Sequence, residues 1–264
     1  MTLLAILIGT LGAGIGSVWL AAALSFGVLT RFTQHMLSLA AGALLATAFM
    51  HLLPEAFESG IPPQALFMAL LLGLVFFFLL DKAELWHHGH EHHQPHEPAA
   101  FHGQHGQHGH SHPAAAGGSW AVLTGDSVHC FGDGILIASA FVADLRLGVI
   151  ASLAVLAHEV PHHMGDLAVL RQSSPTRRVA LLKVTLAGAV TALGGFLGYW
   201  LVDQTEGYLP YFLVVASSSF IYVALADLIP QLQKRLSASE TTAQISWLLV
   251  GMGLVMLVSR LTHS

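Results

Sequence analysis

The chain has 264 residues, of which 54% are hydrophobic and 9% are charged, and its mean hydropathy is +0.66. Because soluble globular domains are about one-quarter charged, this composition excludes such a domain and indicates a protein of the lipid bilayer. The net charge of −5 provides no basic surface for nucleic acid, and no G-x-x-x-x-G-K motif offers a nucleotide site, so we expect neither as a partner.

Eight stretches of the chain are long and apolar enough to cross a bilayer as helices. A bilayer core about 30 Å thick requires about 20 apolar residues at about 1.5 Å per residue. We therefore expect an all-α membrane protein with eight transmembrane helices in one transmembrane domain. Helices 1–3 lie within residues 1–81 and helices 4–8 within residues 119–264, on either side of a loop over residues 82–118. The predicted helices cover residues 3–24, 34–56, 62–80, 120–143, 147–170, 179–201, 209–232 and 243–260.

The end of the second predicted helix resembles the end of the seventh. Residues 49–55 (FMHLLPE) parallel residues 225–231 (LADLIPQ). Since these helices run in opposite directions, the match is typical of an inverted repeat of helices 1–3 and 6–8 around a central pair, a 3+2+3 arrangement. It places His51 and Glu55 near one face of the membrane and Asp227 near the other. A chance match of two proline-terminated helix ends is the alternative.

The loop between the third and fourth predicted helices is rich in histidine. Eleven histidines lie between His87 and His112, among many Gly, Pro and Gln residues. Such a segment has little to bury, so we expect it to be disordered. Neutral imidazoles bind divalent metals near pH 7, which favours a role in collecting or sensing arriving metal. A tolerated linker is the alternative.

Positive charges gather on one side of the predicted membrane. Only Arg146 and Arg260 lie on the side of the two termini. The positive-inside rule then places both termini outside the cytoplasm and the His-rich loop inside it. We expect a multi-pass protein of the plasma (inner) membrane. The residues on the opposite side are Arg31, Lys82, Arg171, Arg177, Arg178, Lys183, Lys234 and Arg235.

The fourth and fifth predicted helices carry polar side chains where these are energetically costly. An ionised Asp costs about 2.5–3.5 kcal/mol at the bilayer centre, and neither helix core contains a Lys or Arg to compensate. Bound cations and internal water are the remaining compensation. The polar residues are Asp126, His129, Cys130 and Asp133 in the fourth helix and His158, Glu159, His162, His163 and Asp166 in the fifth.

Helical spacing divides most of these residues into two sets. His129 and Asp133 are four residues apart, as are His158 and His162, so each pair shares a helix face. Imidazole and carboxylate groups in this combination suit Zn²⁺ or another borderline divalent ion. We expect these four residues to form a first metal site near the bilayer midplane. One residue further around the helices lies a second set, Cys130, Glu159 and His163.

Further acidic and imidazole groups flank the two sets. Asp126 and Asp166 lie about 4.5–6 Å along the helices from the nearest ligand, toward the cytoplasmic side. His51 and Glu55 lie toward the outer side, and Asp227 lies near the inner face. These five residues mark a path across the membrane. Ordinary solvated or hydrogen-bonded residues at helix ends are the alternative.

Three stretches of the chain resemble the ZIP family of zinc and iron permeases. They are residues 125–134 (GDSVHCFGDG), 158–166 (HEVPHHMGD) and 51–55 (HLLPE). The resemblance implies movement of divalent metal into the cytoplasm through a binuclear metal centre on the fourth and fifth helices. It also implies that helices 1, 4, 5 and 6 slide as an elevator against helices 2, 3, 7 and 8, often in a homodimer. By this resemblance the first metal site is His129, Asp133, His158 and His162, and Glu159 belongs to the second.

The second site departs from the family pattern at two positions. Cys130 stands where the family usually has Asn, and His163 stands where it usually has a second Glu. Sulfur and nitrogen are softer ligands than oxygen, which favours Zn²⁺ or Cd²⁺ over Mn²⁺. We therefore expect Zn²⁺ as the transported substrate, with Cd²⁺, Fe²⁺, Co²⁺ and Mn²⁺ as alternatives.

The fifth predicted helix also contains the H-E-x-x-H pattern of zinc proteases. In an intramembrane metalloprotease, His158 and His162 would bind zinc and Glu159 would be the general base. Pro161 argues against this reading, because it breaks a backbone hydrogen bond and kinks the helix that would present both histidines. The neighbouring ligand-type residues would also crowd the open position that catalysis needs. We therefore expect a transporter and not an enzyme; a metal sensor without transport remains a third alternative.

Overall fold

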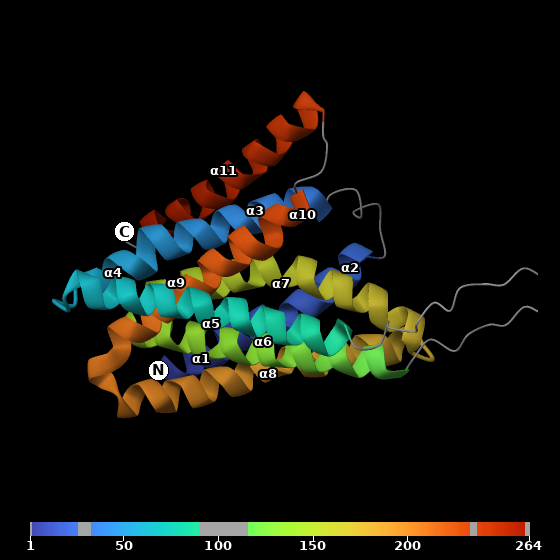
Figure 1. Ribbon diagram of the computed structural model, residues 1–264, viewed down its shortest axis with the longest axis horizontal. Coiled ribbons are helices and arrows are strands. Elements are labelled where there is room, and N and C mark those ends of the chain that lie inside the picture. Colours follow the sequence, from blue (N-terminus) through green and yellow to red (C-terminus); the bar gives the residue numbers. More distant parts are fainter. Residues whose placement is uncertain (1, 26–32, 90–115, 233–236, 262–264) are drawn as a thin grey trace, which may run out of the picture.

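The computed structural model describes residues 2–25, 33–89, 116–232 and 237–261, and every regular element within these ranges is helical. The elements form eight helical rods that run roughly along the length of the molecule (Figure 1). Three rods contain a π-helical turn, labelled η. In chain order the elements are α1 (Thr2–Leu11), η1 (Gly12–Gly16) and α2 (Ser17–Ser25); α3 (Thr33–Thr47), η3 (Ala48–Leu52) and α4 (Leu53–Phe57); α5 (Pro63–Gly89); α6 (Ala116–Ala143); α7 (Leu145–Ser173); α8 (Arg177–Gln204); the short 3₁₀ helix η4 (Glu206–Tyr208); α9 (Leu209–Tyr222), η5 (Val223–Leu228) and α10 (Ile229–Leu232); and α11 (Ala238–Leu261).

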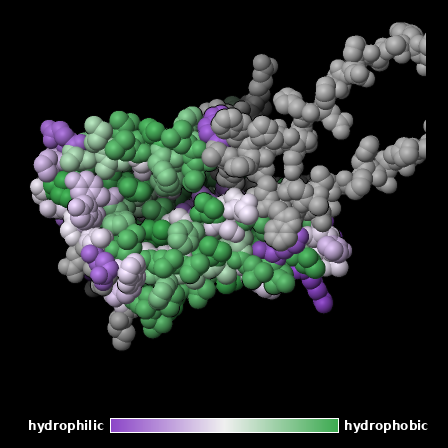
Figure 2. Space-filling model, turned by 60° about the horizontal axis from the view of Figure 1, so that its bottom comes forward, coloured by the Kyte–Doolittle hydropathy of each residue, from purple (hydrophilic) through white to green (hydrophobic). Residues whose placement is uncertain are grey.

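The apolar surface is that of a membrane protein. Seven of the helical rods in the described ranges are long and apolar enough to cross a bilayer. The remaining long helix is α7, whose 29 residues include the predicted metal ligands His158, Glu159, His162 and His163. In Figure 2 hydrophobic residues cover the middle of the visible face, while hydrophilic residues gather toward its two ends. The all-helical prediction is confirmed. The start of α1 and the end of α11 lie at the same end of the bundle (Figure 1).

Several helix boundaries differ from the sequence-based prediction, most of all at the end of the third helix. The third helix was expected to end at residue 80, but α5 continues to Gly89, and the next helix begins at Ala116. A helix can continue past the apolar segment because its backbone hydrogen bonds form in water as well as in lipid. The greater part of the predicted His-rich loop, residues 90–115, lies outside the described residues. Its predicted disorder and metal-collecting role therefore stay predictions.

The two sequence segments that resemble each other share an unusual backbone. Residues 49–55 cross from η3 into α4, and residues 225–231 cross from η5 into α10. In both, a proline follows as the second residue of the α-helical segment, Pro54 in one and Pro230 in the other. Proline has no N–H to donate, and π-helical turns often occur at functional sites. The resemblance thus extends to local backbone shape, while the 3+2+3 repeat itself stays a prediction.

Glycines bring one set of helices into close contact. A Cβ atom on Gly14 would meet the carbonyl oxygen of Gly188, and a Cβ atom on Gly194 would meet that of Phe131. These contacts press the first helical rod and α6 against α8. We call the group of α1, η1, α2, α6, α7 and α8 the first bundle.

A second set of helices is joined in the same way. A Cβ atom on Gly42 would meet the carbonyl oxygen of Leu248, and one on Gly251 would meet that of Leu39, so α3 and α11 lie side by side (Figure 1). Gly73 of α5 similarly approaches α9. We call the group of α3, η3, α4, α5, α9, η5, α10 and α11 the second bundle. Among the glycines that the structure describes, each such contact with another helix lies within one bundle.

The contact between the two bundles is different in kind. Two apolar grooves lie where α7 of the first bundle faces α3 and α11 of the second, with volumes of about 250 and 580 Å³. Leu39, Leu153 and Ala157 line both grooves. Apolar side chains can slide past one another without breaking hydrogen bonds, whereas backbone contacts at glycine hold helices at a fixed distance. Close backbone contacts at glycine thus lie within the bundles, whereas the grooves between the bundles are lined by apolar side chains.

A matched pair of glycines in α11 tests the importance of this packing. Gly251→Ala should destabilise the protein by about 1–3 kcal/mol because the new methyl group collides with the α3 backbone. Gly253→Ala is the control, since a Cβ atom there meets nothing within 4 Å. Thermal unfolding in detergent measures both. Equal melting temperatures for the two variants would contradict the assigned close contact.

Candidate metal centre

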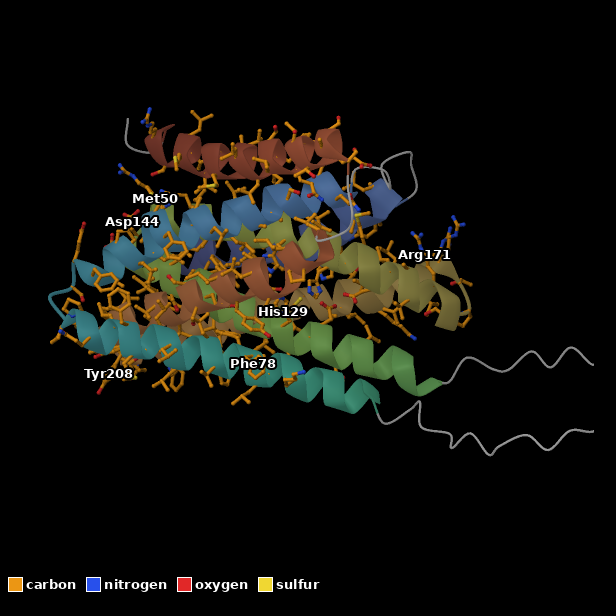
Figure 3. The ribbon with its side chains drawn as sticks, turned by 45° about the horizontal axis from the view of Figure 1, so that its top comes forward. Met50, Phe78, His129, Asp144, Arg171 and Tyr208 are labelled. Carbon is orange, nitrogen blue, oxygen red and sulfur yellow. The ribbon has the colours of Figure 1, made fainter. Side chains whose placement is uncertain are left out.

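The predicted ligands lie on the hairpin formed by α6 and α7. The hairpin turns at Asp144, whose carboxylate accepts a hydrogen bond of 2.8 Å from the backbone N–H of Arg146 and so caps the start of α7. The two helices therefore run in opposite directions beside each other. Figure 3 shows His129 well inside the length of the bundle, between Asp144 toward one end and Arg171 toward the other.

The first cluster consists of His129, Asp133, His158 and Glu159. Potential ligand atoms of these four side chains all lie within 4.8 Å of one another. His158 Nε2 is 3.1 Å from Asp133 Oδ2, and His129 Nε2 is 3.3 Å from Glu159 Oε1. Three of the residues are buried, whereas the His129 side chain is 23% exposed and gives the cluster an opening. Two imidazoles and two carboxylates are a ligand set that suits Zn²⁺.

The second cluster consists of Asp126, Cys130, Glu159 and His163, all of them buried. His163 Nε2 lies 3.2 Å from Glu159 Oε2 and 3.5 Å from Asp126 Oδ1. The thiol sulfur of Cys130 lies 3.6 Å from Asp126 Oδ1 and 3.9 Å from His163 Nε2. The cluster therefore offers one sulfur, one nitrogen and two carboxylates, a softer set than the first.

Glu159 belongs to both clusters. Its Oε1 faces His129 and His158 at 3.3 and 3.4 Å, while its Oε2 faces His163 and Cys130 at 3.2 and 4.0 Å. A carboxylate that presents one oxygen to each side can bridge two metal ions, which in binuclear sites lie about 3.5–4 Å apart. The geometry thus brings the two predicted sites together as neighbours.

The buried carboxylate oxygens of the clusters have few hydrogen-bond partners. Asp126 Oδ2 is buried without one. Asp133 Oδ2 and Glu159 Oε1 are buried and face only imidazole nitrogens of His129 and His158, at 3.1–3.4 Å. A buried acceptor left without a partner costs about 1–3 kcal/mol, and more when charged. A divalent cation among these oxygens would remove that cost, so the buried carboxylates fit a cation-binding role for both clusters.

Other predicted residues are placed differently from the sequence-based expectation. His162 lies outside the first cluster, and its ring stacks on that of His129 with centroids 5.1 Å apart. Asp126, expected only as a path residue, contributes to the second cluster. The spacing of four residues between Asp126 and Cys130 was the signal for this placement.

The remaining path residues belong to neither cluster. Asp166, one turn beyond His162 on α7, has a buried Oδ2 without a hydrogen bond. His51 is half-buried within η3, and Glu55 is exposed in α4. Asp227 lies in η5, and its side chain is outside what the structure describes. A path through these residues stays a prediction.

One contact to the second cluster comes from a residue that the sequence did not single out. Ser17 Oγ, at the start of α2, lies 2.9 Å from His163 Nδ1, and both side chains are fully buried. The two residues are 146 positions apart in the chain, so no local spacing could have indicated the contact.

Comparison with known proteins agrees with this architecture. Residues 1–259 match the family described as ZIP zinc transporter. The chain is 29% identical to human zinc transporter ZIP4 over 258 residues, which covers 79% of this chain and 40% of that protein. It is 32% identical to the zinc transporter foi of Drosophila melanogaster over 152 residues, 57% of this chain and 21% of that protein.

A third relative is zinc transporter ZIP10 of Mus musculus, 34% identical over 152 residues, which cover 58% of this chain and 18% of that protein. The chain thus spans two fifths or less of the length of these relatives. The match to the family nevertheless extends over almost the whole chain, which confirms the resemblance drawn from the motifs. The chain belongs to the ZIP zinc transporter family, a family of multi-pass membrane transporters and not of enzymes.

Proposed function

We propose that the chain moves Zn²⁺ across the membrane through the paired clusters on α6 and α7. The observation that carries the proposal is the arrangement around Glu159, where two sets of buried ligands adjoin within a bundle of membrane helices. Three buried carboxylates in one place favour a bound cation, and a centre well inside the bundle is where transporters hold their substrate. The zinc transporters among the relatives support Zn²⁺ as the substrate.

We further propose that the metal moves into the cytoplasm. Arg171, Arg177 and Arg178 lie around the turn between α7 and α8, opposite the end that carries Asp144 (Figure 3). The positive-inside rule assigns the arginine-rich end to the cytoplasm. The exposed Glu55 and Glu58, three residues apart in the sequence, would then attract cations at the outer end. The homodimer that the family resemblance implies stays a prediction.

The two bundles suggest how the centre could gain access to each side. All ligands of both clusters belong to the first bundle, whose helices are held together by glycine contacts. The apolar grooves between the bundles contain no ligand residue. We therefore favour an elevator motion in which the first bundle carries the metal past the second. This division of helices is the one implied by the family resemblance.

Removing an imidazole from the first cluster tests the proposed function directly. His158→Ala should reduce Zn²⁺ uptake into proteoliposomes at least tenfold, because it removes the first-cluster ligand that contacts both Asp133 and Glu159. Tyr208→Ala is the control, since Tyr208 is 64% exposed and lies at one end of the bundle, away from His129 (Figure 3). Uptake retained by His158→Ala would remove the first cluster from the mechanism. Wild-type protein that binds Zn²⁺ without flux would instead indicate a sensor.

Metal preference should depend on the soft ligands of the second cluster. The double variant Cys130→Asn with His163→Glu replaces sulfur and nitrogen by oxygen donors, so uptake of Mn²⁺ and Fe²⁺ should rise relative to Zn²⁺. Competition assays with these ions and with Cd²⁺ and Co²⁺ in proteoliposomes measure the ratio. The same order of preference in wild type and variant would rule out a selective role for the second cluster.

Bulk placed in the groove between the bundles tests the sliding motion. Leu153 of α7 lines both grooves and is 44% exposed. Leu153→Trp should slow Zn²⁺ uptake while leaving the equilibrium affinity for Zn²⁺ unchanged, because the obstacle lies outside the clusters. Leu182→Trp places the same bulk on an exposed position of α8 and is the control. Equal uptake rates for the two variants would contradict motion along this interface.

A further inference from the structure

The contact between Ser17 and His163 determines which nitrogen of that imidazole carries its hydrogen. The Ser17 hydroxyl oxygen lies 2.6 Å from the carbonyl oxygen of Gly14. A carbonyl only accepts hydrogen bonds, and a hydroxyl has a single hydrogen to donate. That hydrogen must therefore lie between Ser17 and Gly14.

The remaining partner of the hydroxyl oxygen is His163 Nδ1, at 2.9 Å. Because the hydroxyl hydrogen is already committed to Gly14, Ser17 can only accept a hydrogen bond from His163. His163 consequently carries its hydrogen on Nδ1. In a neutral imidazole this leaves a lone pair on Nε2.

The Nε2 atom is the one that faces the second cluster. It lies 3.2 Å from Glu159 Oε2, 3.5 Å from Asp126 Oδ1 and 3.9 Å from Cys130 Sγ. A lone pair at this position is aimed at the space shared by all four ligands. Histidines that bind metal usually donate their other N–H to a fixed acceptor, which sets both tautomer and ring orientation. For His163, the Ser17 hydroxyl oxygen is that acceptor.

The packing of the first helical rod holds Ser17 there. Gly14, which receives the hydroxyl hydrogen, packs directly against Gly188 of α8, and η1 ends one residue before Ser17. A side chain at either glycine would push the rod away from α8. The acceptor is thus held by backbone contacts within the first bundle, and it would travel with the clusters.

We propose that Ser17 is a positioning residue of the second cluster, holding His163 with Nε2 free to bind a soft divalent cation. This inference rests on the proposed function in one respect, namely that the second cluster binds metal. It adds a residue from a third helix to a centre otherwise built on α6 and α7.

Cadmium binding by the whole 264-residue chain tests the proposal. Cys130 is the chain's single cysteine, so the ultraviolet absorption of a Cd²⁺–thiolate bond reports on the second cluster alone. Ser17→Ala should weaken Cd²⁺ binding at this band about 10- to 100-fold, the usual cost of losing such a partner. Ser17→Thr keeps the hydroxyl and should bind like wild type. Equal Cd²⁺ affinity of Ser17→Ala and wild type would overturn the proposal.

A double-mutant cycle separates tautomer control from simple packing. The His163→Glu variant has no Nδ1–H that could donate a hydrogen bond to Ser17. Adding Ser17→Ala to this variant should therefore leave its Cd²⁺ affinity unchanged. An equal loss in both backgrounds would mean that Ser17 only fills space, and would overturn the proposal. A wild-type protein that transports Zn²⁺ but shows no Cd²⁺–thiolate band would overturn it as well, while leaving transport through the first cluster intact.

Discussion

The structure depends on the compensation of negative charge inside a membrane bundle. Asp126, Asp133 and Glu159 are buried on two neighbouring helices, and one oxygen of Asp126 has no hydrogen-bond partner. Placing an ionised carboxylate in the bilayer interior costs free energy on every transfer scale. Imidazoles and a thiol surround them, and these groups bind cations when deprotonated. Under the proposed function, a divalent ion supplies the compensating positive charge.

The rest of the fold serves to hold these groups at fixed positions relative to one another. Glycines such as Gly14 and Gly194 allow backbones to approach so closely that the helices of the first bundle cannot easily separate. The second bundle is joined by the same means at Gly42 and Gly251. Between the bundles lie apolar grooves and no such contacts among the described residues. The contacts within each bundle and the grooves between the bundles are therefore built from different kinds of packing.

Much of this architecture could be predicted from the sequence, because apolar length determines which segments enter a bilayer. The seventh predicted helix, residues 209–232, coincides with the rod from α9 through α10. Helical spacing also identified most members of both clusters. Spacing describes a single helix, however, and cannot show which neighbour faces it. For this reason Glu159 was assigned to one set, His162 was placed with the first, and the distant contact of Ser17 was missed.

Because Glu159 is shared by both clusters, it would affect how a metal-loaded centre releases its ions. One carboxylate supplies a single negative charge, yet its two oxygens face different clusters. Two doubly charged ions at the spacing of a bridged pair repel strongly in a medium of low permittivity. With both clusters occupied, each ion would therefore be bound more weakly, so the arrival of one ion would lower the affinity for the other. Tight capture from a dilute source and rapid discharge need not conflict in such a centre, since the incoming ion itself helps to expel its predecessor.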